Sequence, residues 1–545
     1  MNPQGTWICD GVPKNNNQQY PSTEPHTPQE NHGPDCIMCG LPKQAMIAGG
    51  KKSQKTVVSS IPGSKSSARL AFIVAGIAIA LLAGLGLYKV LQGKQPAEVT
   101  SSVSQPPTAN TEAVAPADPQ AIVSDTSANA QLISQGEKIL FAGATNPAKQ
   151  AGALAFAQKK WDDAIAQYQQ AVTANPNDPE SKIYLNNAQA KKAGNPLTMA
   201  VVVPVTPNPD TAKEVLRGVG QYQDKFNASP PTAGRLLEVV IVNDIEPQKA
   251  ASLAQDLIKS PNILGVLGHG VDNGSQQAIA LYEQAGLTVL SPISTSITPN
   301  SSGQSTLQTI SLAKKANELL GSYLKTVGTT LAKYANSKQS PAAVAIFYNS
   351  DSQYSQQLKD QFTAALSQVN GKVVKEVDIN AAGFDAAATI ADVTNAGAKI
   401  GFLALSKNKA DQAVAIAKAN KSLELIGGDE LYNPAILIQG GDAIQNIVLA
   451  VPWSSQPNDP FANQAATIWK GRVSWRTATA YDATQALATA LSQNPNRSGV
   501  SQQLQVGIPI TGTATDFNVL NEVPLVKAVP GKYGPAGSKY QFDPI

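Results

Sequence analysis

Cysteine and histidine residues near the amino terminus have the types and spacing of a metal site. Two residues separate Cys36 from Cys39 in a Cys-x-x-Cys-Gly turn. Such a turn presents two thiolates to one zinc ion, and a structural zinc site needs four ligands. Cys9 is the third candidate ligand, and His32 or His26 would complete the tetrahedron. The alternative is a degenerate zinc ribbon, or reduced thiols without a metal.

A second group of polar residues follows two apolar runs in the middle of the chain. The run over 263–267 ends at a Gly-His-Gly turn and leads into a helical pattern with Ala278 and Tyr282 on one face. The run over 287–290 ends in the hydroxyl-rich segment 291–295. The carboxyl ends of parallel strands share one sheet edge, where backbone amides and helix N-termini face a crevice. The pattern therefore predicts a small-molecule site at this edge.

The order of these residues resembles the leucine/isoleucine/valine-type substrate-binding proteins of ATP-binding-cassette (ABC) importers. The likeness extends from about residue 197 to about residue 510. It implies a type I periplasmic-binding-protein fold whose two lobes close on an amino acid or a similar small polar solute. The matching features are the Gly-His turn, Gln276, Ala278, Tyr282-Glu283, Gly286, Ser291-Pro292 and Ser294-Thr295.

The resemblance also implies ligand contacts from both lobes. In lobe one, Thr295 matches the family's hydroxyl donor and Ile293 its backbone carbonyl, with Ser294 between them. In lobe two, Tyr354 matches the aromatic residue that covers the ligand, and Asp429 matches the acid that binds its ammonium group. A zwitterionic amino acid needs donors for its carboxylate and an acid for its ammonium group. The alternative roles are helix capping for the hydroxyls and a turn position for the acid.

Asp272 departs from the family, which commonly has a serine at this position. A desolvated aspartate would repel a ligand carboxylate unless it is protonated, turned away or bridged by a cation. Asn273 and Ser275 are then the candidate donors of this loop, and the change favours a cationic, amidic or polyol ligand. Lobe two has Ser406 and Lys407 where the family has an aromatic pair. Lys407 would either meet a ligand anion or stay solvated.

Alternating strands and helices must position these residues. Alternation of this kind specifies parallel sheets covered by helices on both faces. We predict an α/β two-lobed clamshell of doubly wound parallel sheets over 196–545, with lobe one at about 198–310 and 453–510 and lobe two at about 311–452. For the tail after Val506 we predict no helix or strand. The predicted strands are 198–205, 236–242, 263–267, 287–290, 342–347, 372–377, 400–404, 423–426 and 447–451, and the predicted helices are 211–226, 247–259, 312–335, 353–369, 386–395, 409–420 and 477–491.

An apolar segment without a charge, from Leu70 to Tyr88, precedes the binding domain. At about 1.5 Å per residue it is long enough to cross a bilayer core of roughly 30 Å. A long hydrophilic segment stands before it, which favours an uncleaved transmembrane helix over 70–92 rather than a signal peptide. Lysine and arginine are more numerous on its N-terminal flank. We therefore expect a single-pass inner (plasma) membrane protein with a cytoplasmic N-terminus and a periplasmic or extracellular binding domain.

Three further segments differ in composition. Residues 1–69 are rich in Asn, Gln, Pro and Ser and are expected to form a mostly disordered cytoplasmic tail. Residues 93–135 read as a flexible linker. Residues 136–195 resemble the tetratricopeptide repeat, of which about three copies are normally needed for an independent solenoid. This region would either recruit a protein partner or pack on the next domain. Its matching residues are Gly152, Trp161, Ala164, Tyr168, Ala171 and Pro176.

Composition narrows the function further. The net charge is +3 and the basic residues are scattered, so no nucleic-acid partner is expected. No nucleophile pattern surrounds His269 and no Walker-type loop occurs, so we predict no enzyme and no cofactor for the binding domain. The leading hypothesis is a membrane-tethered receptor that delivers an amino-acid-like solute to an ABC permease or senses it. The alternative is a scaffold with a degenerate clamshell that recruits partners through the repeat-like region.

Overall fold

The protein is described by a computed structural model that divides it into two units, 1–116 and 117–545. In the first unit, β1 (Trp7–Cys9) pairs antiparallel with β2 (Gln29–Asn31). The predicted membrane segment over 70–92 lies outside the described residues. Within the described part of the chain, no helix has the length and apolarity needed to cross a membrane. The structure describes residues 127–141, 146–206, 208–231, 234–245, 247–269, 273–291, 296–299, 305–308, 312–510, 523–535 and 537–545, and the backbone of 7–9 and 29–31.

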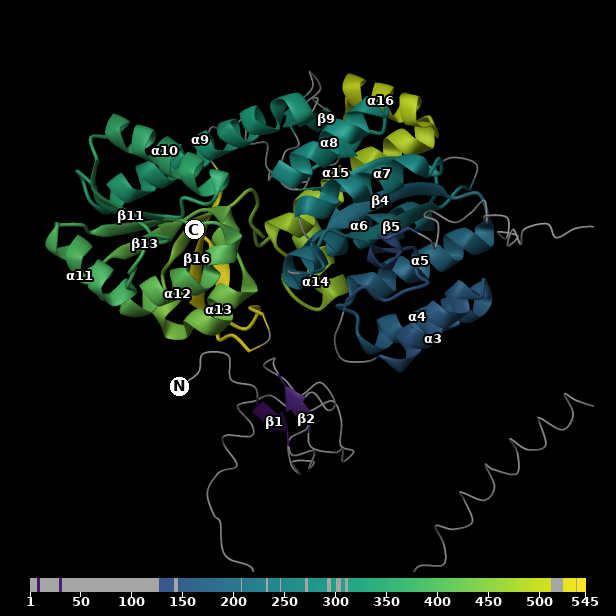
Figure 1. Ribbon diagram of the computed structural model, residues 1–545, viewed down its shortest axis with the longest axis horizontal. Coiled ribbons are helices and arrows are strands. Elements are labelled where there is room, and N and C mark those ends of the chain that lie inside the picture. Colours follow the sequence, from purple (N-terminus) through teal and green to yellow (C-terminus); the bar gives the residue numbers. More distant parts are fainter. Residues whose placement is uncertain are drawn as a thin grey trace, which may run out of the picture. The chain divides into compact units, whose positions relative to one another are not determined.

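Lobe one is built on a sheet with the strand order β3-β5-β4-β6-β7. Figure 1 labels β4 and β5 of this sheet among the surrounding helices. Four of its strands are parallel, and β3 at the edge is antiparallel to β5. All residues of β4 and β5 are buried, as expected for strands that are covered on both faces. The strands are β3 (Ile133–Ser134), β4 (Leu197–Val203), β5 (Leu237–Asn243), β6 (Ile263–Gly268) and β7 (Val289–Leu290).

Successive residues of these strands face different helices. Ala200 and Val202 of β4 lie in one apolar cluster with α7 and α8, whereas Met199 and Val201 lie in another with α6 and α15. This follows from the two-residue period of a strand. The helices of lobe one are α6 (Pro209–Ala228), α7 (Ala250–Lys259), α8 (Asn273–Gln284), α14 (Pro460–Trp469), α15 (Trp475–Gln493) and α16 (Arg497–Val506).

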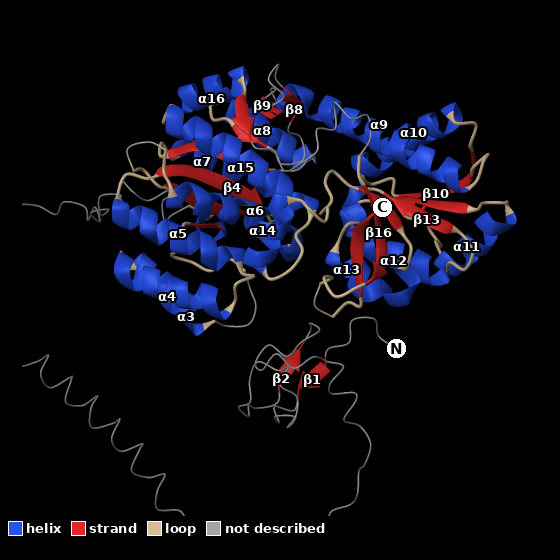
Figure 2. Ribbon diagram, turned by 180° about the vertical axis from the view of Figure 1, so that it is seen from behind, coloured by secondary structure: helices blue, strands red, loops and turns tan. Residues whose placement is uncertain are grey.

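Lobe two has a sheet with the strand order β11-β10-β12-β13-β14-β16-β17 (Figure 2). The first five strands are parallel to one another, β16 pairs antiparallel with β14, and β17 pairs antiparallel with β16. Val344 and Ile346 of β10 pack with α9 and α10, while Ala345 and Phe347 lie in the cluster with α11, α12 and α13. The strands are β10 (Ala343–Tyr348), β11 (Lys372–Asp378), β12 (Ile400–Ala404), β13 (Glu424–Gly427), β14 (Val448–Ala450), β16 (Leu525–Pro530) and β17 (Tyr540–Pro544). The helices are α9 (Leu312–Lys338), α10 (Gln353–Gln368), α11 (Ala386–Asn395), α12 (Ala410–Ala419) and α13 (Pro434–Gly440).

The predicted α/β fold with two mostly parallel sheets is confirmed, but the sheets are mixed rather than purely parallel. The tail after Val506, for which no element was predicted, supplies β16 and β17 to the sheet of lobe two. It also supplies β15 (Ile508–Ile510), which pairs with β9 (Ser305–Gln308), itself paired with β8 (Ser296–Pro299). The apolar pattern of β8, β9 and β15 is too brief to indicate a strand, and in β16 and β17 a charged residue and a proline interrupt it.

The end of the predicted linker belongs to lobe one, which corrects its boundary at residue 135. Ile133 is buried and pairs with Val242 through β3. Just before it, the Ser127 hydroxyl and the Asn129 amide donate to one carboxylate oxygen of Asp256 at 2.7 and 2.8 Å. Local composition does not reveal these bonds because the partner lies more than a hundred residues further along the chain.

The region compared with the tetratricopeptide repeat contains three helices, α3 (Pro147–Ala157), α4 (Trp161–Ala174) and α5 (Pro179–Ala193). A Cβ atom at Gly152 would lie 2.9 Å from the Tyr168 ring, so a glycine allows α3 and α4 to pack closely. On its other side, α5 packs against α6 and β5 of lobe one. We refer to these three helices as the helical region.

The Asn187 side chain fastens the helical region to the sheet. Its amide donates to the Val239 carbonyl at 2.7 Å and accepts from the Val239 N–H at 2.9 Å. Val239 lies in β5, two residues before the residue of β5 that pairs with Ser134. The amide of Asn187 thus satisfies the backbone of β5 where the short strand β3 no longer reaches it.

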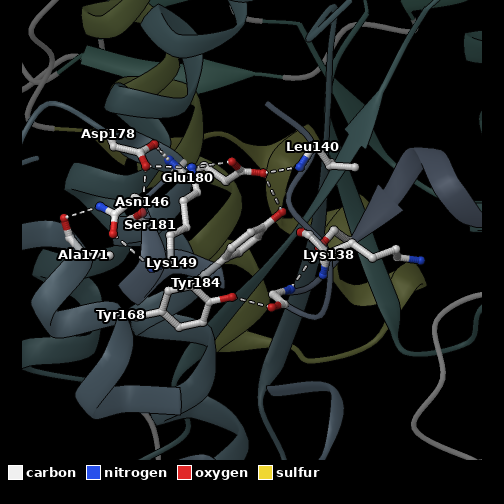
Figure 3. Close-up of polar contacts among 12 residues, drawn as sticks. Lys138, Leu140, Asn146, Lys149, Tyr168, Ala171, Asp178, Glu180, Ser181 and Tyr184 are labelled. Carbon is white, nitrogen blue, oxygen red and sulfur yellow. Dashed lines mark hydrogen bonds and ion pairs between the residues drawn. The ribbon is translucent and has the colours of Figure 1, made fainter. Parts of the chain in front are cut away.

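A buried ion cluster lies within the helical region (Figure 3). The Lys149 ammonium contacts a Glu180 carboxylate oxygen at 2.6 Å and an Asp178 oxygen at 2.7 Å. The other oxygen of Glu180 accepts from the Leu140 N–H at 2.6 Å and from the Tyr184 hydroxyl at 3.1 Å. Burial raises the pKa of Glu180, and the charge of Lys149 opposes that rise. The charge of this glutamate is therefore neutralised inside the protein.

Candidate functional site

Asp429 lies at the carboxyl end of a parallel strand of lobe two, the position where α/β sheets bind small molecules. Strand β13 ends at Gly427, and Asp429 begins the short 3-10 helix η4 (Asp429–Leu431). Its side chain is 2% exposed, and the Tyr354 hydroxyl donates to it at 2.9 Å. A Cβ atom at Gly428 would collide with this hydroxyl, so glycine before the acid is what lets Tyr354 reach it.

Two tyrosines on different helices face the carboxylate of Asp429. Tyr354 comes from the first turn of α10 and Tyr323 from α9, and both are buried. Burial and the negative charge of Asp429 hold the pKa of each phenol well above its usual value. Both tyrosines therefore stay protonated and present O–H donors to the acid.

Asp429 has no direct cationic partner among the described residues. The salt bridges of the described residues all join other side chains, and none of them brings a basic nitrogen within 4.0 Å of an Asp429 carboxylate oxygen. Burial raises the pKa of Asp429 to about 6, and the neighbouring charge of Glu430 acts in the same direction. Tyr323, Arg476 and Tyr354 lower it in part. The site is thus a buried acid held by hydroxyl groups, with its negative charge only partly balanced.

Hydrogen bonds tie the neighbouring strand ends together beside Asp429. The Asn349 amide, which follows β10, donates to the Ser406 hydroxyl at 3.0 Å and accepts from the Ser406 N–H at 3.0 Å. The Lys407 N–H donates to the Glu430 carboxylate at 2.7 Å and so connects the end of β12 to η4. These bonds give Ser406 and Lys407 a structural role that was not predicted.

The loop after β6 in lobe one is built around His269. This residue has a positive φ of 63°, and its ring lies 5.5 Å from the Tyr282 ring between centroids. Its carbonyl accepts from the Ser291 hydroxyl at 3.3 Å, and its Nδ1 atom lies 3.8 Å from an Asp244 oxygen. Ser275 is buried in the first turn of α8, which follows this loop. His269 thus holds the ends of β6 and β7 together.

Several predicted site residues fall outside the part of the chain that the structure describes. Asn273 has a described helical backbone at the start of α8, and Cys9 a described strand backbone, but their side chains are not among the described ones. These ligand and zinc assignments stay predictions. In the described residues, no group of three potential metal ligands occurs. The residues that lie outside are Asp272, Ile293, Ser294 and Thr295 for the ligand, and His32, Cys36 and Cys39 for the metal.

Two residues near Asp429 were not predicted from the sequence. Tyr323 lies in a long helix whose sequence marks no position as functional. Arg476 stands one residue before the predicted helix 477–491 and forms part of α15. A signal for it existed, because Arg476 and Asp482 are the only charged residues in this alanine- and threonine-rich helix. A charged residue in a helix that is otherwise uncharged and almost wholly buried indicates a specific partner.

The two helix-covered sheets define a two-lobed α/β fold. In sequence, residues 196–512 match the family model of the periplasmic binding proteins. The match covers more than half of the chain, and the chain therefore belongs to the periplasmic binding protein family. This family consists of binding proteins and not of enzymes, which confirms the prediction that the protein is not an enzyme. A comparison with curated proteins gives no match.

Solved structures of other binding proteins are similar in fold. One is the branched-chain amino acid transporter substrate-binding protein of Streptococcus pneumoniae, solved in complex with isoleucine. It is 16% identical to this chain, and the superposition has a TM-score of 0.51 and covers 64% of this chain and 100% of the S. pneumoniae protein. A type 1 periplasmic binding protein of Bordetella pertussis is 16% identical with a TM-score of 0.50, over 64% and 100%. An ABC transporter substrate-binding protein of Sphaerobacter thermophilus is 17% identical with a TM-score of 0.50, over 64% and 98%.

Proposed function

We propose that this protein is an extracytoplasmic receptor for an amino acid or a similar small polar solute, and that Asp429 receives the cationic group of that solute. The observation that carries the proposal is the burial of Asp429 without a direct cation among the described residues. A carboxylate in this position gains most from a charged donor that arrives with the ligand. A ligand ammonium group would supply the missing charge.

The opposite end of the solute would bind to lobe one. Thr295, Ser294 and the backbone of Ile293, which follow β7 in the sequence, and Asn273 and Ser275, which follow β6, would supply its partners. Hydroxyl and amide groups suit a carboxylate, an amide or a polyol. With Asp272 in the same loop, the ligands to test first are those with a second cationic group or an amide.

Affinity would come from closure of the two lobes around the solute, without covalent chemistry. The closed receptor would deliver the solute to an ABC permease or report its presence. The remaining assignments are part of the same proposal: a membrane anchor over 70–92, a cytoplasmic tail over 1–69 that binds zinc through Cys9, Cys36, Cys39 and His32, and a linker from residue 93 to the start of the described segment at 127. The helical region would serve as a rigid extension of lobe one.

Thermal unfolding of the full-length protein in mild detergent, against a library of amino acids, amides and amines, tests the proposal. At a concentration 100 times its Kd, a true ligand stabilises the folded state by about 2.7 kcal/mol. We expect one class of solute to raise the Tm of the native protein and to raise that of Asp429→Asn far less. If no compound shifts the Tm and the helical region captures a protein partner, the protein is a scaffold instead.

A further inference from the structure

Arg476 of lobe one reaches the short helix that carries Asp429 in lobe two. Its Nη1 atom donates to the Tyr432 carbonyl at 2.9 Å. The N–H of Tyr432 in turn donates to the Asp429 carbonyl at 3.0 Å, which closes the turn. The turn therefore has Asp429 at its start and the contact with Arg476 at its end.

Arg476 is itself fixed within lobe one. Nη1 lies 3.2 Å from a Glu214 carboxylate oxygen, and the guanidinium group lies 4.4 Å from the centre of the Trp475 ring. The Glu214 carbonyl accepts from the Thr477 hydroxyl at 2.8 Å, which joins α6 to α15 next to the ion pair. Arg476 and Glu214 are both buried. A cation held by an acid and an aromatic face keeps one position, so it transmits the placement of lobe one to whatever it touches.

We propose that Arg476 is a positioning residue for Asp429: anchored by Glu214 in lobe one, it holds the turn of lobe two that carries the ligand acid. The contact between the lobes and the charge state of the binding acid are thereby coupled. The inference rests on the proposed function only in that it takes Asp429 as the ligand acid. The geometry and its first test need no ligand.

The charged and titratable groups around Asp429 show why Arg476 matters for its ionisation. Glu430 comes from the same turn, Tyr354 from α10, Tyr323 from α9 and Arg476 from α15. Of these described groups only Arg476 is a cation, and a nearby positive charge favours the ionised form of a carboxyl group. Loss of Arg476 would leave the acid with two neutral donors and one negative neighbour. Asp429 would then take up a proton at a higher pH.

Arg472 offers a matched control, because this residue, which lies just before α15 in lobe one, also contacts lobe two. It pairs with Asp543 of β17, and its guanidinium group lies 4.9 Å from the centre of the Tyr533 ring. Burial raises the pKa of Tyr432 and the charge of Arg472 opposes that rise, but Arg472 is not among the groups that shift the pKa of Asp429. Removal of Arg472 therefore breaks a bridge between the lobes without removing the cation near the acid.

The test is the protonation midpoint of Asp429 in the ligand-free, full-length protein. The carboxyl band in the infrared spectrum is followed between pH 4 and 8, and the spectrum of Asp429→Asn is subtracted to isolate this group. We expect Arg476→Met to move the midpoint upward by about half a pH unit or more, and Arg472→Met to leave it in place. A midpoint that does not differ between Arg476→Met and the native protein overturns the inference.

A second variant keeps the test decisive if Arg476→Met does not fold. Glu214→Gln preserves the shape and an acceptor oxygen but removes the negative charge that balances Arg476. The positive charge then acts more strongly on Asp429, and its midpoint moves downward. If the Arg476–Glu214 pair had only a structural role, the two variants would not move the protonation midpoint of Asp429 in opposite directions. If solute binding depends on Asp429 but the midpoint is unmoved in both variants, only the role of Arg476 is refuted. If the midpoints move but no solute binds, only the proposed function is refuted.

Discussion

Two buried carboxylates of this protein, Glu180 in the helical region and Asp429 in lobe two, have opposite surroundings. Burial raises the pKa of both. Glu180 touches the Lys149 ammonium at 2.6 Å and accepts a backbone N–H, so its charge and its hydrogen-bonding capacity are satisfied. Asp429 receives the Tyr354 hydroxyl at 2.9 Å but, in the described part of the chain, no direct cation.

We interpret the difference as that between a structural acid, Glu180, and a proposed binding acid, Asp429. A buried ion pair adds little net stability, but removal of one partner is costly because the other charge stays buried. A buried charge that the fold leaves partly unbalanced lowers stability, and such groups cluster at functional sites where a ligand completes them. Glu180 would then fix the helical region on lobe one, while the charge of Asp429 would be balanced only when a solute binds.

The largest expected effect is on stability, at the structural acid. Lys149→Met leaves Glu180 buried without its cation, and the free energy of unfolding should fall by about 3–5 kcal/mol. Urea denaturation measures this change. The control is Lys192→Met, which removes an exposed pair with Asp162 and should cost less than about 1 kcal/mol. Similar losses for both variants would mean that the buried cluster does not hold the helical region.

The next effect is on binding, at Asp429. Asp429→Asn removes the charge that would meet the ligand cation, and the affinity for the solute should fall by roughly 100-fold, about 3 kcal/mol. Calorimetric titration measures the affinity. The free energy of unfolding without ligand should stay level or rise, because a partly balanced buried charge is removed. Asp442→Asn is the control, since Asp442 also accepts from a tyrosine, Tyr540 at 2.8 Å, but on the surface.

The pH dependence of stability gives a third contrast. The pKa of Asp429 is about 6 in the folded protein, above its ordinary value of 3.8, so the folded state holds a proton that the unfolded state has released. The stability contributed by this proton is present below pH 3.8 and is lost as the pH rises to about 6, up to about 3 kcal/mol in total. Urea denaturation of the ligand-free protein at several pH values should show this loss. In Asp429→Asn the difference should vanish; an unchanged pH profile would show that the acid is ionised without penalty.

A smaller effect is expected from the hydroxyl donor. Tyr354→Phe removes one hydrogen bond to Asp429 and should reduce the affinity for the solute by about five- to tenfold, or about 1–1.5 kcal/mol. The pKa of Asp429 should rise as well, because the bond favours the ionised form. The control is Tyr334→Phe, which loses a bond to Glu424 at 2.7 Å elsewhere in lobe two. An affinity that falls equally in both variants would point to general loosening of the lobe.

The sequence predicts the sheets of this protein well but its long-range contacts poorly. Repeated apolar runs between amphipathic helices indicate parallel strands, and β12 at Ile400–Ala404 has the predicted bounds. Strands β3, β16 and β17 were missed: β3 has two residues and pairs with β5 more than a hundred residues further along the chain, and β16 pairs with the distant β14 and in turn carries the edge strand β17. Strand pairing of this kind leaves no local pattern in the sequence.

The candidate site was only partly predictable for the same reason. Tyr354 and Asp429 were proposed from the family resemblance, and the structure places their side chains 2.9 Å apart. Tyr323 and Arg476 come from helices that are remote in sequence, so no spacing rule points to them. Glu180 reads as the acid of an ordinary helix start after Asp178 and Pro179, and only the packing of α5 between two layers buries it.

The most direct test of the whole account is the affinity for the solute that the thermal-unfolding screen identifies, measured at pH 7.5 and pH 5 in the native protein and in Asp429→Asn. With a pKa of about 6, Asp429 is ionised at the higher pH and mostly protonated at the lower one. The account predicts that the native protein loses about tenfold in affinity at pH 5, while the variant binds weakly and equally at both pH values. Equal affinities of the native protein at both pH values, or strong binding by the variant, would contradict it.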